Sequence, residues 1–272
     1  MKIFKNIIFI LALAITYQAS AENNKDIDLF IFGGQSNAVG WKSNAEGYPA
    51  DPEHIDEKII LYCVTPGASE EPGVWKTLGP QPGRFPDGHF GPEITFARGL
   101  FKNGMHPAIF KYSIGASSLA GTWKGPGEHG YYDKMTAEFA KALRQLKEKG
   151  FKVHIKAFIW IQGESDGKTE KNANAYKKRL QTLISDIRNN VVKNPTLPVI
   201  LGVDEQHPFL KKHPQIVKAH QEIAENDNNI IFTSMYGLKK ADKTHLTPEG
   251  VIEHGKRILA AAKKLLNTQD SP

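Results

Sequence analysis

The chain has 272 residues, a formal charge of +6 and a single cysteine. Its lysines are scattered and form no basic stripe interleaved with aromatic residues, so nucleic acid is not expected as a partner. One cysteine excludes an internal disulfide. Cys63 lies in an apolar run and is expected to be a small core residue rather than a nucleophile.

The first 21 residues have the features of a secretory signal peptide. Lys2 and Lys5 precede a short apolar stretch, Ile7 to Ile15, and Ala19-Ser20-Ala21 supplies the small residues that signal peptidase cuts after. The apolar stretch is short for a membrane span. We expect export to the periplasm or the exterior and no membrane contact after cleavage; a retained N-terminal anchor is the alternative. Residues 22–272 are expected to form one domain.

Beyond the leader, short β-rich runs alternate with longer helical patterns. Strands are predicted at 27–32, 59–64, 108–113, 153–161, 198–203 and 229–233. Helices are predicted at 92–103, 133–149, 172–191, 211–226 and 248–267, the last with Thr247 as N-cap and Pro248 at its first position. This alternation predicts an α/β fold with a mainly parallel sheet, helices on both faces, and a site beyond the carboxyl ends of the strands.

Two stretches rich in glycine and proline, 65–91 and 115–130, follow predicted strand ends. Long ordered loops often carry function, so both are expected to wall the site. Trp123 and Tyr131, in the loop after Gly115, could stack on a sugar ring or pack against the core.

A serine and a distant Asp/His pair suggest nucleophilic catalysis. Ser36 follows the first predicted strand on a tight turn, where a nucleophile can reach solvent. Asp242 stands three residues before His245; an acid so placed can orient the imidazole, which can take the proton of the serine. If the fold joins these segments, the chain is a serine hydrolase. The alternative is a turn-forming serine with Asp242 capping a loop.

Four motifs occur in order along the chain: Gly34-Gln35-Ser36-Asn37, Phe90-Gly91-Pro92-Glu93, Trp160-Ile161-Gln162-Gly163-Glu164-Ser165-Asp166 and Asp242-Lys243-Thr244-His245. Together they resemble SGNH-type hydrolases of the branch that holds sialate O-acetylesterases and the acetyl xylan esterases of carbohydrate esterase family 6. The resemblance implies a flavodoxin-like three-layer α/β/α sandwich, no metal or other cofactor, and hydrolysis of acetyl esters on sugars. It makes Ser36 the nucleophile, His245 the base and Asp242 its orienting acid.

Ester attack creates an oxyanion that hydrogen-bond donors must meet. The expected donors are the backbone N–H groups of Ser36 and Gly115 and the side-chain amide of Gln162, which stands where the wider superfamily has an asparagine. A purely structural amide is the alternative for Gln162. The segment Ile114-Gly115-Ala116 departs from the two glycines that relatives often have, so the second peptide donor is left open.

Gln35, Asn37 and Glu164 are expected to support the site. Glu164 could accept backbone N–H groups near Gly34 or Asn37, which we favour, or act as a second carboxylate that helps His245.

Other polar residues near the motifs have less defined roles. Asp166 is interpreted as a loop or helix-cap acid, and His207, after the fifth strand, could touch substrate. Ile161 stands where relatives often carry histidine, which bears on specificity. Glu93 and Arg98 are five residues apart and are not expected to pair on one helix face. No histidine pair has zinc-ligand spacing with a carboxylate or cysteine.

The expected function is removal of O-acetyl groups from carbohydrate, with acetylated xylan or another acetylated glycan as the substrate. Acetylated sialic acid, a lipase or thioesterase on the same scaffold, and a glycan-binding protein without turnover are the alternatives. The polar, glycine-rich loops and the lack of an evident apolar lid disfavour long acyl chains. The sequence predicts no oligomeric state.

Overall fold

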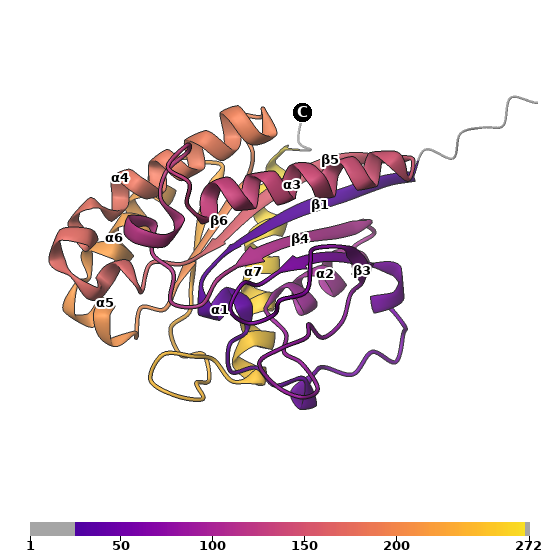
Figure 1. Cartoon of the computed structure of the whole chain (residues 1–272), viewed down its shortest axis with the longest axis horizontal. Coiled ribbons are helices and arrows are strands. Elements are labelled where there is room, and N and C mark those ends of the chain that lie inside the picture. The colour runs from indigo at the N-terminus through magenta and orange to yellow at the C-terminus, as the bar shows by residue number, and fades with distance from the viewer. Residues whose placement is uncertain (1–24, 270–272) are drawn as a thin grey trace, which may run out of the picture.

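The computed structural model describes residues 25–269, and Figure 1 shows their arrangement. The predicted signal peptide, residues 1–21, lies outside the described residues. None of the helices within 25–269 has the length and apolar character needed to cross a membrane.

One sheet of seven strands forms the centre of the described chain, in the order β3-β2-β4-β1-β5-β6-β7. Its strands are β1 (Lys25–Gly34), β2 (Ile60–Val64), β3 (Trp75–Thr77), β4 (Pro107–Ser113), β5 (Phe151–Ile161), β6 (Val199–Val203) and β7 (Ile230–Ser234). Neighbours pair in parallel except for β3, which is antiparallel to β2. The six predicted strands are confirmed. The short edge strand β3 was missed because three residues within a loop show no periodic pattern.

The helices are α1 (Ser36–Val39), α2 (Glu93–Lys102), α3 (Tyr131–Glu148), α4 (Glu170–Asp186), α5 (Pro208–Lys212), α6 (Gln215–Glu225) and α7 (Pro248–Gln269). The single helix predicted at 211–226 is wrong, because the chain breaks between α5 and α6. His213 leaves the helical region, with φ −127° and ψ 71°, as expected before a proline. The predicted cap of α7 is confirmed: the Thr247 hydroxyl accepts a hydrogen bond from Gly250 N at 3.1 Å.

Helices cover both faces of the sheet, which confirms the three-layer α/β/α sandwich (Figure 1). Side chains of β1 alternate between two buried clusters, because successive residues of a strand point to opposite faces. Leu29 and Ile31 pack with residues of α3, α4 and α6. Phe30 and Phe32 pack with residues of α2 and α7. A strand segment buried on both faces reads as a continuous apolar run, as residues 29–32 of β1 do.

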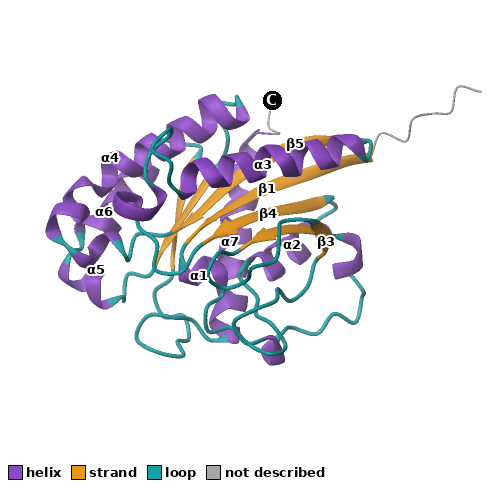
Figure 2. Cartoon of the chain, in the orientation of Figure 1, coloured by secondary structure: helices purple, strands orange, loops and turns teal. Residues whose placement is uncertain are grey.

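The predicted site residues follow three adjacent strands. Strand β1 lies between β4 and β5, and its last residue, Gly34, is in register with Ser113 and Ile161. Ser36, Gly115 and Gln162 therefore emerge side by side at the carboxyl edge of the sheet. Figure 2 shows the loops gathered around α1 at this edge.

A buried charge cluster supports the helix that carries Ser36. The Lys111 ammonium, on β4, lies 2.9 Å from Glu93 Oε1 and donates to the oxygens of Gln81 at 2.8 Å and Val39 at 3.1 Å. Lys111 and Glu93 are fully buried, and the Val39 carbonyl ends α1. A cation at a helix C-terminus is favourable. Arg98 instead pairs with Asp56 at 2.7 Å, so Glu93 and Arg98 do not pair, as predicted.

Candidate active site

The turn before Ser36 requires glycine. Gly34 has φ +148°, and a Cβ there would lie 2.2 Å from the Ile161 carbonyl oxygen. This close approach lets Gln35 N donate to Ile161 O at 2.9 Å, and α1 begins at the next residue. The turn thus fixes Ser36 directly at the end of β1. The Ser36 side chain keeps a small opening to solvent, since the residue is 6% exposed.

Asp242 and His245 form the predicted acid and imidazole pair. His245 Nδ1 lies 2.9 Å from Asp242 Oδ2, and the same carboxylate accepts the backbone N–H groups of Thr244 at 2.7 Å and His245 at 2.9 Å. Partial burial works to raise the pKa of Asp242, but the hydrogen bonds from His245 and Thr244 outweigh it and hold the pKa well below its usual value. A carboxylate only accepts, so Nδ1 carries the hydrogen and Nε2 keeps a free lone pair.

The side chain of Asn37 joins this pair to the Ser36 turn. Asn37 Nδ2 donates to Thr244 O at 3.2 Å, and Asn37 Oδ1 accepts from Leu246 N at 3.3 Å. The amide therefore holds the backbone on both sides of His245. Among residues 25–269 the Ser36 hydroxyl makes no hydrogen bond with the imidazole; such bonds are often long before substrate binds.

Two of the predicted oxyanion donors are available for an incoming group. Within the described chain, the backbone N–H groups of Ser36 and Gly115 have no hydrogen-bond partner. Gly115 lies against the indole of Trp41, where a Cβ would be 2.8 Å from a ring carbon. Ala116 takes φ +55°, a region that glycine adopts more easily than alanine.

The side chain of Gln162 is occupied by internal contacts. It is fully buried, and its Nε2 donates to Asp166 Oδ2 at 2.8 Å and to Ser117 O at 3.1 Å. Its Oε1 accepts from the Tyr176 hydroxyl at 3.1 Å. An amide has two N–H donors, and both have protein partners here. This geometry favours the structural alternative, and the oxyanion role of Gln162 stays a prediction.

Gln35 and Asp166 tie the motif loops together. Gln35 Oε1 accepts from Ser165 N at 3.3 Å, which joins the Ser36 turn to the loop after β5. Asp166 accepts from the backbone N–H groups of Leu119 at 2.8 Å and Ala120 at 2.9 Å, so it caps the turn that follows Gly115. The interpretation of Asp166 as a capping acid is confirmed. The loop that carries Gly115 is thereby fixed to the loop that carries Gln162.

Trp123 packs in the core. It is fully buried, and its indole N–H donates to the Ser117 hydroxyl at 2.8 Å. Of its two predicted roles, packing is the one that the structure supports. Tyr131 packs partly buried beside it, with ring centroids 6.5 Å apart.

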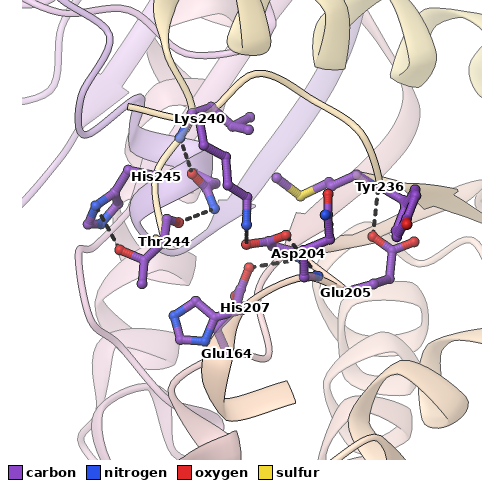
Figure 3. A network of polar contacts seen from close by, with 12 residues as sticks. Glu164, Asp204, Glu205, His207, Tyr236, Lys240, Thr244 and His245 are labelled. Carbon is purple, nitrogen blue, oxygen red and sulfur yellow. Dashed lines mark hydrogen bonds and ion pairs between the residues drawn. The ribbon is translucent and has the colours of Figure 1, made fainter. Parts of the chain in front are cut away.

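Glu164 supports a different element from the one predicted. Its Oε1 accepts from Asp204 N, after β6, at 3.1 Å, so the expectation that it binds N–H groups near Gly34 or Asn37 is wrong. Burial and the nearby Asp204 charge raise the pKa of Glu164 to about 7. Asp204 forms an ion pair at 2.5 Å with Lys240, which belongs to the same segment as His245 (Figure 3).

His207 lies close to the acid and imidazole pair but has a structural contact. Its Nδ1 accepts from Phe209 N at 3.2 Å, which caps α5. Burial, and then the nearby charges of Lys240 and His245, lower the pKa of His207 to about 4. The ring is therefore neutral at ordinary pH, with its hydrogen on Nε2. Contact with substrate stays a prediction for this residue.

Trp41 and Arg84 are site residues that the sequence did not reveal. The Trp41 indole stacks with the His245 ring, with centroids 6.5 Å apart, and the Arg84 guanidinium lies 3.7 Å above the indole. Arg84 belongs to the predicted loop 65–91, which therefore does reach the site. No spacing rule connects residues 41, 84 and 245, so only the folded chain shows that they meet.

Neither a metal centre nor a reactive thiol is formed by the described residues. No three His, Cys, Asp or Glu side chains within 25–269 are grouped as metal ligands would be. Cys63 contacts Gln81, and burial raises the pKa of its thiol to about 12. A thiol with a raised pKa is a weak nucleophile, and Cys63 packs partly buried against the hydrophobic core.

The sheet order, the serine turn and the acid and imidazole pair define an α/β/α sandwich that carries the candidate groups of a serine hydrolase at the carboxyl edge of its sheet. Residues 26–264 match the sequence profile of a family described as carbohydrate esterase, sialic acid-specific acetylesterase. The chain belongs to this family and is a carboxylic ester hydrolase. No curated protein matches the chain.

Solved structures with low sequence identity share the fold. A protein from Arabidopsis thaliana has a TM-score of 0.65 at 20% identity, over 87% of this chain and 98% of its own. A carbohydrate acetylesterase from Xanthomonas citri has a TM-score of 0.58 at 18% identity, over 89% of this chain and 56% of its own. NanS has a TM-score of 0.59 at 15% identity, over 90% of this chain and 98% of its own.

We predict that Glu164 makes the stability of the fold depend on pH. Its pKa is about 7 in the folded chain against an ordinary value of 4.5, so between these values the folded state holds a proton that the unfolded state has lost. Stability from this group is therefore full below about pH 4.5 and falls as the pH rises towards 7. Glu164→Gln removes this effect. The free energy of unfolding of the variant, relative to that of the wild type, should therefore rise by roughly 3 kcal/mol between about pH 4.5 and about pH 7.

Denaturant unfolding at about pH 5 and about pH 8 measures this difference. The exposed Glu148→Gln is the matched control and should show no such trend. The prediction would be contradicted if the free energies of unfolding of Glu164→Gln and the wild type differed by the same amount at both pH values.

Proposed function

We propose that the protein is an exported serine esterase that removes O-acetyl groups from carbohydrate through Ser36, His245 and Asp242. Family membership supports an acetylesterase acting on acetylated carbohydrate. The observation that carries the assignment of residues is the Asn37 amide. It holds Thr244 and Leu246, on both sides of His245, against the turn of Ser36.

Acylation uses the base and the two free N–H groups. His245 Nε2 takes the proton of Ser36 Oγ as the oxygen attacks the acetyl carbonyl carbon. The carbonyl oxygen becomes an oxyanion, which the N–H groups of Ser36 and Gly115 stabilise; each such donor is typically worth about 3–4 kcal/mol. The carbon–oxygen bond to the sugar then breaks, and His245 gives its proton to the departing sugar oxygen. Asp242 stays ionised and stabilises the imidazolium.

Deacylation repeats the same steps with water. His245 takes a proton from a water molecule, whose oxygen attacks the acetyl group on Ser36. The bond between Ser36 Oγ and the acetyl carbon breaks, Oγ recovers the proton, and acetate leaves. The reaction as written needs only Ser36, His245, Asp242, the two N–H groups and water.

Acetylated xylan or another acetylated glycan is the substrate we propose first. The large apolar side chains exposed among the described residues are Val74, Phe209 and Tyr236, which come from separate segments. Such a surface gives little support to a lipase or thioesterase with long acyl chains.

Arg84 favours acetylated sialic acid as a second candidate substrate. The guanidinium is stacked on Trp41, whose indole adjoins His245, and no carboxylate within residues 25–269 forms an ion pair with it. An arginine without an acidic partner can bind a carboxylate through two parallel hydrogen bonds. A sugar acid whose acetyl group reaches Ser36 would bring such a carboxylate to this part of the site.

Export is part of the proposal and is supported by the leader pattern in residues 1–21. Cleavage after Ala21 would release the esterase to the periplasm or the exterior. Acetylated glycans outside the cytoplasm would then be within its reach.

We predict that Ser36→Ala abolishes ester cleavage without unfolding the chain. Removal of a serine nucleophile lowers kcat by about a thousandfold or more, because the covalent step is lost. Acetate release from acetylated xylan and hydrolysis of p-nitrophenyl acetate measure the loss. Ser43→Ala is the matched control, since Ser43 is buried and its hydroxyl has no partner among the described residues. Turnover by Ser36→Ala at the wild-type rate would contradict the assignment of Ser36 as the nucleophile.

The second candidate substrate predicts a selective effect of Arg84→Met. The KM for O-acetylated sialic acid, relative to that for p-nitrophenyl acetate, should rise about tenfold or more, because a hydrogen bond to a charged group is worth about 1.5–3 kcal/mol. Arg144→Met, an exposed change on α3, should leave this ratio as it is. If the wild type does not cleave the sialic acid ester, or if Arg84→Met leaves the ratio unchanged, the second candidate is contradicted. A neutral acetylated glycan is then the remaining candidate substrate.

A further inference from the structure

The segment from Lys239 to Thr247 forms a small hairpin that carries both Asp242 and His245. Ala241 N donates to His245 O at 2.9 Å, and Thr247 N donates to Lys239 O at 3.1 Å. The tip is open to solvent, since the Asp242 side chain is 39% exposed. The hairpin is thus closed on itself, and its position relative to Ser36 must be set by contacts with the rest of the chain.

Two polar anchors attach the hairpin to the body of the protein. The first is the Asn37 amide, which binds Thr244 and Leu246. The second is the ion pair between Lys240 Nζ and Asp204 Oδ2, at 2.5 Å. Figure 3 shows the Lys240 side chain running from the hairpin to Asp204, beside Glu164. The two anchors act on different elements, α1 and the end of β6.

Asp204 is itself fixed at the edge of the sheet. It follows β6 directly, its side chain is fully buried, and its Oδ1 accepts from Gln206 N at 3.1 Å. Its own N–H donates to Glu164, on the loop that also binds Gln35 through Ser165. The ion pair therefore connects His245 to the Ser36 turn by a second route, through β6 and the loop after β5.

The chemistry of the pair argues for a positional rather than a stabilising role. Taking both charges out of water costs about as much as their attraction returns, and apolar replacements of such pairs are often equally stable. The Lys240 side chain is 17% exposed and that of Asp204 is 0% exposed, so this cost applies here. A buried ion pair does, however, define one geometry, because an unpaired charge in any other arrangement is strongly unfavourable.

We propose that Lys240 and Asp204 are positioning residues that hold the His245 hairpin over Ser36. This proposal rests on the proposed function. It assigns no contact with substrate to either residue. It makes catalysis depend on a charge pair that neither the motifs nor the triad contains.

The test separates position from stability. Lys240→Met should lower kcat for p-nitrophenyl acetate by about tenfold to a hundredfold, since small displacements of catalytic groups have effects of this size, while KM stays within about twofold. Lys240→Met/Asp204→Asn removes both charges and keeps the Oδ1 acceptor for Gln206. It should unfold at the same denaturant concentration as the wild type and keep the low kcat. Lys240→Arg, which preserves the charge, should recover most of the activity.

Lys239→Met is the matched control. This neighbouring lysine pairs with Glu249 at 3.5 Å, and both side chains are more than half exposed. Its kcat should stay within about twofold of the wild type. A stable double variant with wild-type kcat, or an equal loss in Lys239→Met, would overturn the proposal. Ser36→Ala in the same assay reports on the proposed function separately, because its loss of activity does not depend on the ion pair.

Discussion

The site depends on holding two distant segments of the chain together at the carboxyl edge of β1. Asn37 and Leu246, which are 209 residues apart, are joined through one side-chain amide. Closing a loop of this length costs conformational entropy, which a hydrogen bond alone does not offset. Hydrophobic packing in the sandwich offsets this entropy cost. Helix α7 packs on the same buried cluster as β1 and α2, and it brings the hairpin that precedes it back to the Ser36 turn. The polar anchors then set the final position.

Buried charges lie behind both halves of the site. Lys111 and Glu93 sit beneath α1, and Lys240 and Asp204 sit beside the His245 hairpin. In each pair the lysine comes from one segment and the acid from another, so the pair connects elements that side-chain packing alone could allow to slide. Such pairs add little stability, but each one defines a single arrangement, because breaking it would leave an uncompensated buried charge. Nucleophilic catalysis needs that definition, because the reacting atoms must be aligned.

Much of the fold follows from the sequence, because its signals are local. Apolar runs and helical periodicity located the six parallel strands and most helices. The short helix α1, the edge strand β3 and the break before Pro214 are the exceptions. The strand ends predicted that Ser36, Gly115 and Gln162 lie side by side, since parallel strands end together, and the register of β1, β4 and β5 brings them there. What the sequence lacks is the direction in which a side chain points. Glu164 was expected to bind the Ser36 turn but binds Asp204, and the role of Gln162 depends on which acceptors its amide meets. Lys240, Arg84 and Trp41 belong to no motif, and their contacts arise from the folding of three loops against one another.

The proposed reaction requires that Ser36 be a nucleophile activated by His245. Treatment of the purified protein with a fluorophosphonate, followed by peptide mass spectrometry, tests it most directly, because the reagent bonds covalently to an activated serine. We expect one adduct, on Ser36, that forms in the wild type and is lost when His245 is changed to alanine. An adduct on another residue, or an unchanged rate of labelling without His245, would contradict it.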